Sequence, residues 1–358
     1  MKVAVVGPDA SAKGGIATVI RNFKGITDHS LVELFFFTTW REGSSYKHFA
    51  DTFLSIITFP IFLTKNKIDL VHLHVAQNGS FYRKAILLLI AKLLGIPTIF
   101  HLHASQFDQF YKIKNKVIKR VIRFVLEQAT GVVVLSESWK NFYESIATID
   151  CQVIENAVYI PKSNLYNRKS KKIISFGRLG KRKGTFDLIA VAKKIGEQHP
   201  DYQFILYGDG ELQQAQQAIT ESKLQNVKLG GWVTNQVKEE IIKDCRIHVL
   251  PSYQEGMPMA ILETMAYGIP NISTTVGGIP QIITSGENGF LVEPGNKKQL
   301  ETALLKLIEK DSLAQKISQN SYQTIQQSFS IQTYYKKWIA YYNKIESGEV
   351  NGRINKLK

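Results

Sequence analysis

Two glutamates stand in a stretch of the chain that is otherwise apolar. Glu255 and Glu263 have seven residues between them in the segment SYQEGMPMAILETMAYGIP, residues 252–270. The run IHVLPSY predicts a strand, QEGM its exit turn, and Pro258 suits the first turn of a helix that runs to about Tyr267. Glu255 is then expected at the carboxyl end of the strand and Glu263 on the following helix, where both can line one pocket.

A basic, glycine-rich loop supplies the opposite charge. The loop GRLGKRKG, residues 177–184, follows the predicted strand KIISF. At a strand end, Arg178 can hold a diphosphate with two hydrogen bonds and Lys183 can add a second positive charge. A solvated surface loop is the alternative. Acids for hydroxyls and bases for phosphates together indicate a site for a sugar nucleotide.

Each acid also has a structural interpretation. Glu255 could be a carboxylate that the dipole of the following helix favours, and Glu263 a buried acid that backbone groups satisfy. Two further glycine-rich turns follow predicted strands: YGDGEL, and GPDASAKGG with Gly14 and Gly15 before a helical pattern. Backbone amides at such turns can hold phosphate. Neither a P-loop nor a G-x-G-x-x-G after the first strand is present, which argues against P-loop ATPases and ordinary dinucleotide dehydrogenases.

The elements that position these residues follow a simple pattern. Short β-rich runs alternate with helix-length segments in two successive series, which predicts parallel sheets with crossover helices. The fold class is therefore α/β, with two doubly wound, Rossmann-like domains facing across a cleft. Apolar periodicity stops near residues 159–172, where Pro, Ser, Asn and Lys collect. We expect an N-terminal domain at residues 1–165 and a C-terminal domain at residues 166–328.

Composition narrows the class of protein. The 358 residues include 45 Lys and Arg against 30 Asp and Glu, which gives a net charge of +15. Such a surface attracts nucleic acid, anionic lipid or phosphorylated substrates. No apolar run is long and uninterrupted enough to span a membrane, and the first residues read as a strand rather than a signal peptide. Cys151 and Cys245 form no metal or disulfide pattern, so we expect a cytoplasmic protein.

Five motifs together resemble a known family. GRLGKRKG, YGDGEL, PSYQEGMPMAILETMAYGIP, GGIPQII and ENGFLVEPGN occur in the order and spacing of the retaining GT-B-fold glycosyltransferases of family four, the glycosyl transferases group 1. The resemblance covers the second half of the chain, and the first half through KGG and HLHAS. It implies transfer of a sugar from a UDP- or GDP-linked donor to a glycan acceptor, without a cofactor. No Asp-x-Asp motif stands at a matching strand end, so we expect no metal requirement.

The resemblance also assigns roles to residues. Arg178 and Lys183 would neutralise the donor diphosphate. Glu255 would lie against the donor sugar, where it stabilises an oxocarbenium-like state, and Glu263 would hold the ribose hydroxyls. The domain at 1–165 would take the acceptor and the domain at 166–328 the donor. The further donor-binding positions that it implies are Gly14, Gly15, Val233, Gly256, Met257 and Leu262.

A histidine of the first half completes the implied catalytic set. His101 and His103 point to the same side of the predicted strand TIFHLHAS, and the family often places a histidine at the end of that strand. His103 matches this position better; the alternative is that one or both are core histidines. The resemblance departs from the family pattern at Gln281, where a glutamate is common, so the choice of sugar and base stays open.

A basic amphipathic segment indicates the kind of acceptor. FYKIKNKVIKRVIRFVLEQA, residues 110–129, spaces Ile113, Val117, Val121 and Leu126 near a helical period among lysines and arginines. Such a helix can lie on anionic membrane; the alternative is a crossover helix that packs its apolar stripe on the sheet. With the net charge, this favours a polyprenyl-diphosphate-linked acceptor at the inner membrane, in capsule, O-antigen or lipopolysaccharide biosynthesis.

The C-terminal residues are expected to form a helix followed by a tail, and two alternative functions stay open. Residues 329–346 are expected to form a helix that crosses back to the N-terminal domain, and residues 347–358 a polar tail. A GT-B-fold sugar-nucleotide epimerase or hydrolase is one alternative function. A basic binding protein without catalysis is the other, although no nucleic-acid-binding module is recognisable and we expect no nucleic-acid partner.

Overall fold

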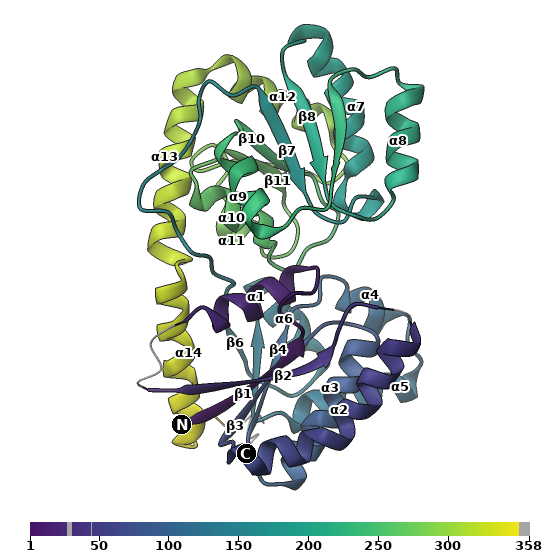
Figure 1. Cartoon of the computed structure of the whole chain (residues 1–358), viewed down its shortest axis with the longest axis vertical. Helices are drawn as coiled ribbons and strands as arrows, with labels where there is room; N and C mark the ends of the chain where they lie inside the picture. Colours follow the sequence, from purple (N-terminus) through teal and green to yellow (C-terminus); the bar gives the residue numbers. More distant parts are fainter. Residues whose placement is uncertain (27–30, 44, 351–358) are drawn as a thin grey trace. The chain divides into compact units, whose positions relative to one another are not determined.

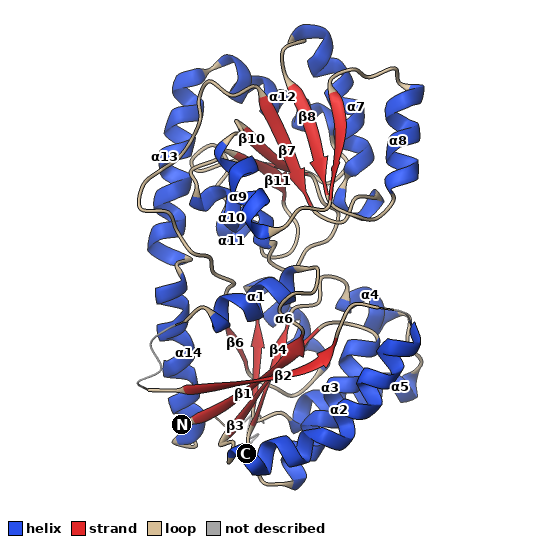
Figure 2. Cartoon of the chain, viewed as in Figure 1, coloured by secondary structure: helices blue, strands red, loops and turns tan. Residues whose placement is uncertain are grey.

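The computed structural model describes residues 1–26, 31–43 and 45–350 and divides the chain into two compact units (Figure 1). The first unit comprises residues 1–156 and the chain from Ile331 onward, and the second comprises residues 157–330. Each unit is built on a six-stranded parallel sheet with helices on both faces (Figure 2). The predicted class of two doubly wound α/β domains is confirmed.

The first unit has the strand order β2-β1-β3-β4-β5-β6. Its central strands are buried along their whole length, because helices cover both faces of the sheet. The strands are β1 (Lys2–Pro8), β2 (Glu33–Trp40), β3 (Leu70–Val75), β4 (Thr98–Leu102), β5 (Gly131–Val134) and β6 (Cys151–Val153). The helices are α1 (Gly15–Lys24), α2 (Ser45–Asn66), α3 (Gly79–Leu93), α4 (Phe107–Lys112), α5 (Lys116–Gln128), α6 (Glu137–Ile146) and α14 (Ile331–Glu346).

The second unit has the strand order β12-β11-β10-β7-β8-β9. Its strands are β7 (Lys172–Phe176), β8 (Gln203–Tyr207), β9 (Val227–Gly231), β10 (Ile247–Leu250), β11 (Asn271–Thr274) and β12 (Phe290–Val292). Its helices are the 3₁₀ turn η1 (Lys181–Lys183) and α7 (Thr185–Gln198), α8 (Leu212–Glu221), α9 (Asn235–Lys243), α10 (Met259–Ala266), α11 (Ile279–Ile282), α12 (Lys297–Glu309) and α13 (Asp311–Ser328). Strands β8 and β9 follow on one side of β7, and β10 to β12 on its other side. The carboxyl ends of the strands at such a switch point are where open α/β sheets bind ligands.

The division between the units lies a few residues before the expected boundary at 165. Residues after Asn156 already pack on the second unit: Tyr322 donates its hydroxyl proton to the Pro161 carbonyl at 2.7 Å, and the Leu165 amide donates to the Tyr267 carbonyl at 3.2 Å. Helix α14 belongs to the first unit. Of the expected polar tail, residues 351–358 lie outside the described part of the chain. Within the described residues, no helix combines the length and the apolar character that crossing a membrane requires.

Candidate active site

Glu255 lies in the turn that follows β10, and its carboxylate is held by two donors. The residue is 5% exposed. Lys183 Nζ and Ser252 Oγ both donate to Glu255 Oε1, at 2.5 and 2.7 Å. A buried carboxylate is stable only when it is paired and hydrogen-bonded. Lys183 and Glu255 are 72 positions apart, so the fold has brought the predicted base and the predicted acid into direct contact.

Two glycines allow this contact. Gly184, which ends η1, has φ +70°, and a Cβ there would lie 2.0 Å from the Pro251 carbonyl oxygen. Gly277 has φ +59°, and a Cβ there would lie 2.1 Å from the carbonyl oxygen of Glu255. Both positions combine a left-handed backbone with a close approach of another chain segment, so only glycine fits. The basic loop and the loop after β11 therefore pack directly against the Glu255 turn.

Arg178 lines a different part of the same sheet edge. It borders a cavity of about 590 Å³ with Arg182, Glu211 and one glycine from each of the turns GRLGKRKG and YGDGEL, Gly180 and Gly210. The two turns lie side by side, since the Leu179 amide donates to the Asp209 carbonyl at 2.6 Å. The Arg182 guanidinium also donates to the Gln254 carbonyl, next to Glu255, at 3.1 Å. Guanidinium groups and glycine amides around one cavity can hold a diphosphate.

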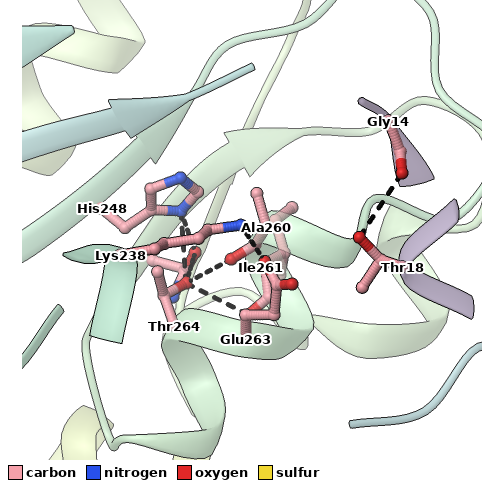
Figure 3. Close-up of polar contacts among 9 residues, drawn as sticks. Gly14, Thr18, Lys238, His248, Ala260, Ile261, Glu263 and Thr264 are labelled. Atoms are coloured by element: carbon pink, nitrogen blue, oxygen red, sulfur yellow. Dashed lines mark hydrogen bonds and ion pairs between the residues drawn. The ribbon is translucent and has the colours of Figure 1, made fainter. Parts of the chain in front are cut away.

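Glu263 projects from α10 and forms an ion pair with Lys238 of α9 (Figure 3). The Lys238 ammonium lies 4.9 Å from the centroid of the Phe176 ring, and Phe176 belongs to an apolar cluster against which Val233 also packs. The Glu263 side chain is 18% exposed and meets a lysine, unlike the backbone-satisfied buried acid of the alternative interpretation. Its carboxylate oxygens can therefore accept from ligand hydroxyls as well as from Lys238.

The other second-unit positions differ in what they can offer a ligand. Met257 is 4% exposed, and the Gly256 carbonyl accepts from the Gly278 amide at 2.6 Å. Leu262 is fully buried inside α10, so its side chain belongs to the core. Pro258 is the N-cap of α10, which begins one residue later than the sequence predicts.

The predicted positions of the first unit gather at the start of α1 and the end of β4. Gly14 and Gly15 are exposed, and the Gly14 carbonyl accepts from the Thr18 hydroxyl at 3.4 Å (Figure 3). His103 Nε2 lies 2.9 Å from His74 Nδ1, and burial lowers the pKa of His103 to about 3. His101 is fully buried, with Nδ1 3.0 Å from His72 Nε2, so it is the core histidine of the alternative interpretation.

Three of these histidines could hold a metal ion. Ring nitrogens of His72, His74 and His101 lie within 4.8 Å of one another, and burial lowers the pKa of each well below 6.5, so the rings are neutral. Neutral imidazole is a metal ligand. His72 is already committed, however, because His101 contacts one ring nitrogen and the Tyr342 hydroxyl the other, at 3.0 and 2.7 Å. These rings therefore serve mainly as a packed polar core under α14.

Sequence reasoning missed two partners of the predicted acids. Ser252 and Lys238 contact Glu255 and Glu263, respectively. Ser252 lies three residues before Glu255 in the segment 252–270, and a hydroxyl at a predicted strand end could have indicated a hydrogen-bond donor to Glu255. Lys238 belongs to a polar helical segment and is followed by two glutamates, so the sequence gives no sign that it pairs with Glu263.

Both halves of the chain match known glycosyltransferase families. The family model for glycosyl transferases group 1 matches residues 159–324, and the model for glycosyltransferase family 4 matches residues 28–160. The UDP-Gal:alpha-D-GlcNAc-diphosphoundecaprenol alpha-1,3-galactosyltransferase of Escherichia coli is 30% identical over 303 residues, which cover 77% of this chain and 76% of that protein. The chain belongs to the group 1 glycosyltransferases.

Solved structures agree with this family on the fold. The sucrose-phosphate synthase (tll1590) of Thermosynechococcus elongatus superposes with a TM-score of 0.79 at 17% identity, covering 97% of this chain and 99% of that one. Anabaena Alr3699/HepE in complex with UDP-glucose gives 0.74 at 19% identity, covering 96% and 99%. The group 1 glycosyltransferase described here thus has the GT-B fold that its motifs indicate.

Proposed function

We propose that this group 1 glycosyltransferase moves a sugar, with retention of configuration and without a metal ion, from a UDP- or GDP-linked donor to a polyprenyl-diphosphate-linked glycan. The observation that carries the proposal is the buried contact of Lys183 with Glu255 beside the cavity of Arg178. Cations fixed before the reaction can stabilise the charge that develops on the departing diphosphate. The E. coli relative acts on a diphosphoundecaprenol-linked acceptor, which supports this acceptor class.

The donor half of the proposal assigns each charge a task. Arg178 and Lys183 bind the diphosphate. When a donor phosphate accepts hydrogen bonds from the Lys183 ammonium, the Glu255 carboxylate is freed to face the sugar. Glu263 holds the ribose hydroxyls, with Lys238 keeping its carboxylate in place. His103, neutral because of burial, can donate or accept one hydrogen bond at the sugar without adding charge.

The acceptor half rests on an apolar surface of the first unit. Ile113, Val117 and Val121 are 77, 65 and 43% exposed, so they do not pack on the sheet as the alternative interpretation requires. Of the four predicted stripe residues only Leu126 is buried. Helix α5 packs through Ile122 and Val125 together with Leu126.

This surface extends beyond α5. Helix α3 contacts both α5 and α2 (Figure 1), and α2 exposes Phe53, Leu54, Ile57 and Ile61 by 50–61%. Lys112, Lys116, Arg120 and Arg123 are exposed around the apolar side chains of the α4–α5 segment. Apolar side chains ringed by basic ones bind anionic lipid surfaces. We therefore place the enzyme at the cytoplasmic face of the inner membrane, in cell-envelope polysaccharide biosynthesis.

Donor binding is tested by thermal shift of the full chain with UDP, GDP and their sugar conjugates, without added metal. A ligand well above its dissociation constant should raise the melting temperature. Arg178→Ala should abolish the shift, whereas Lys181→Ala, an exposed change in the same loop, should keep it. Transfer to a prenyl-diphosphate-linked sugar, followed by NMR of the product anomer, tests retention. Release of free sugar alone would move the assignment to a hydrolase.

Membrane contact is tested by flotation with vesicles. The wild-type chain should float with vesicles of anionic phospholipid, and Val117→Glu with Val121→Glu should reduce the bound fraction by about tenfold, because two charges enter the apolar surface. The paired change Lys297→Glu and Lys298→Glu, on α12 of the second unit, alters the net charge more without touching that surface. Equal loss in both variants would indicate a purely electrostatic attraction and contradict the apolar docking surface.

A further inference from the structure

The first unit contains a cavity of about 630 Å³ whose charged residues have no role in the proposed donor site, although the predicted donor-binding positions Gly14 and Gly15 also border it. It lies at the carboxyl ends of β1, β2 and β3, because Pro8, Trp40 and His74 line it. Helices α2 and α3 form another wall through Thr52, Arg83 and Lys84. The charged side chains among its described lining residues are Lys13, Arg83 and Lys84, all of them basic.

Lys84 is the least expected of these cations. It is 1% exposed, and its ammonium donates to the Thr39 hydroxyl at 2.7 Å. Among the ion pairs of the described residues none involves Lys84, so a charged ammonium here lacks a counterion. Burial accordingly lowers the pKa of Lys84 well below 10.5. A lysine is rarely buried without a carboxylate partner, which indicates that an anion from outside the chain completes the site.

Two neighbouring groups also lack partners. His74 is fully buried, and its Nε2 has no hydrogen-bond partner although the residue lines the cavity. Arg83 donates from Nη1 to the Thr52 hydroxyl at 3.1 Å, while its buried Nε makes no hydrogen bond. Burial lowers the pKa of Arg83, the charge of Asp51 opposes this only in part, and the Asp51 carboxylate itself pairs with Arg41 at 3.7 Å. Unused donors therefore remain on the side of the cavity that carries the cations.

Helix N-termini add further donors to the same space. Gly14 and Gly15 begin α1, and Gly79 and Ser80 begin α3; all four line the cavity. Neither helix has a side chain that caps its first amides. Free amides and the positive end of the helix dipole favour a phosphate.

We propose that this cavity binds the diphosphate of the lipid-linked acceptor, with Lys84 and Arg83 as its cationic ligands. The inference rests on the proposed function and specifies its acceptor site. The acceptor is favoured over the donor as the source of phosphate because α2 and α3 also form the exposed apolar surface: Thr52 lines the cavity, and Phe53, next to it, is 60% exposed. A prenyl chain on that surface would bring its diphosphate to this wall.

The test uses the full chain and farnesyl diphosphate as a short probe, with binding measured by isothermal titration. Lys84→Met keeps the length of the side chain and removes the charge, and should weaken farnesyl diphosphate binding about tenfold while leaving UDP affinity within about twofold. Lys92→Met, an exposed change on the same helix, should leave both affinities unaltered. Farnesol and inorganic pyrophosphate separate the lipid from the phosphate contribution: the loss in Lys84→Met should appear with pyrophosphate and not with farnesol.

Each other outcome counts against the site. Unchanged farnesyl diphosphate affinity in Lys84→Met and in Arg83→Gln, with UDP still bound, would overturn the cavity assignment and leave the glycosyltransferase function standing. A parallel loss of UDP affinity in Lys84→Met would show that the cavity serves donor phosphate. Failure of the wild-type chain to bind either UDP or farnesyl diphosphate would overturn the proposed function itself. If Lys84→Met does not fold, Arg83→Gln alone decides, because Arg83 is less buried.

Discussion

At the scale of single residues, Glu255 carries the most specific expectation. Its carboxylate is almost fully buried, and among the described residues its donors are Lys183 and Ser252, both at Oε1. A group held on one oxygen keeps the other available for a ligand. This asymmetry fits a side chain that faces a reacting sugar, which is the role proposed for Glu255.

Replacing Glu255 by Gln removes the charge and preserves the shape. We expect Glu255→Gln to slow sugar transfer by raising the activation free energy by roughly 2 to 4 kcal/mol, by analogy with the loss of one preorganised electrostatic contact. The melting temperature should also fall, because Gln can still accept from Ser252 but leaves the largely buried Lys183 ammonium without a counter-charge. Single-turnover transfer and a thermal melt measure the two effects. Glu287→Gln, at an exposed position of the second unit, is the matched control; transfer by Glu255→Gln at the control rate would remove Glu255 from the site.

At the scale of elements, the loop after β11 determines where the Glu255 turn can lie. Gly277 and Gly286 both have positive φ, at +59° and +84°, but only Gly277 is crowded, by the Glu255 carbonyl. The two glycines therefore separate backbone strain from steric fit. A left-handed alanine costs roughly 1 to 2 kcal/mol by itself.

Gly277→Ala should cost more than this strain, because its methyl group must displace the Glu255 backbone. We expect a destabilisation of the second unit beyond about 2 kcal/mol and a loss of transfer activity. Gly286→Ala, where the Cβ meets open space, should show the strain alone and keep activity. Urea unfolding and a transfer assay compare the two variants. Equal stability and equal activity would mean that the loop moves freely and does not position Glu255.

At the scale of the whole molecule, buried histidines should make stability depend on pH. Burial lowers the pKa of His72, His74 and His101 well below 6.5, that of His103 to about 3 and that of His248 to about 4. Below pH 6.5 the unfolded chain takes up protons that the folded chain does not, so stability is complete above 6.5 and falls as the pH drops towards 3. Each histidine contributes about 1.4 kcal/mol per pH unit in this window.

The melting temperature should accordingly fall between about pH 7.5 and 5.5. His248→Gln should reduce this dependence in the second unit, because it removes a buried histidine whose pKa burial lowers to about 4. Differential scanning calorimetry at several pH values follows both units. A melting temperature that stays constant over this range would show that the histidines protonate in the folded chain.

Short sequence patterns were sufficient to predict the two sheets and the strand ends at which the site residues lie. Alternating strand and helix patterns predicted two doubly wound sheets, and strand-end motifs placed Glu255 in the turn after β10 and Arg178 after β7. These features are local, because a glycine turn, a helix start and an apolar run each depend on a few neighbouring residues. Together with the family motifs, they were enough to identify a GT-B glycosyltransferase.

Partners and burial were decided only by tertiary structure. The contact of Lys183 with Glu255 joins residues 72 positions apart, and Glu263 finds Lys238 on another helix. The stripe of Ile113, Val117 and Val121 has the spacing of a packing face on one helix, yet the segment forms two helices, with Ile113 between α4 and α5, and all three residues are exposed while α5 buries other residues. Lys84 is 1% exposed, although lysines are mostly exposed in folded proteins. A helical period shows that two faces differ, but only the packing of the helix on its sheet decides which face, and which charge, loses contact with water.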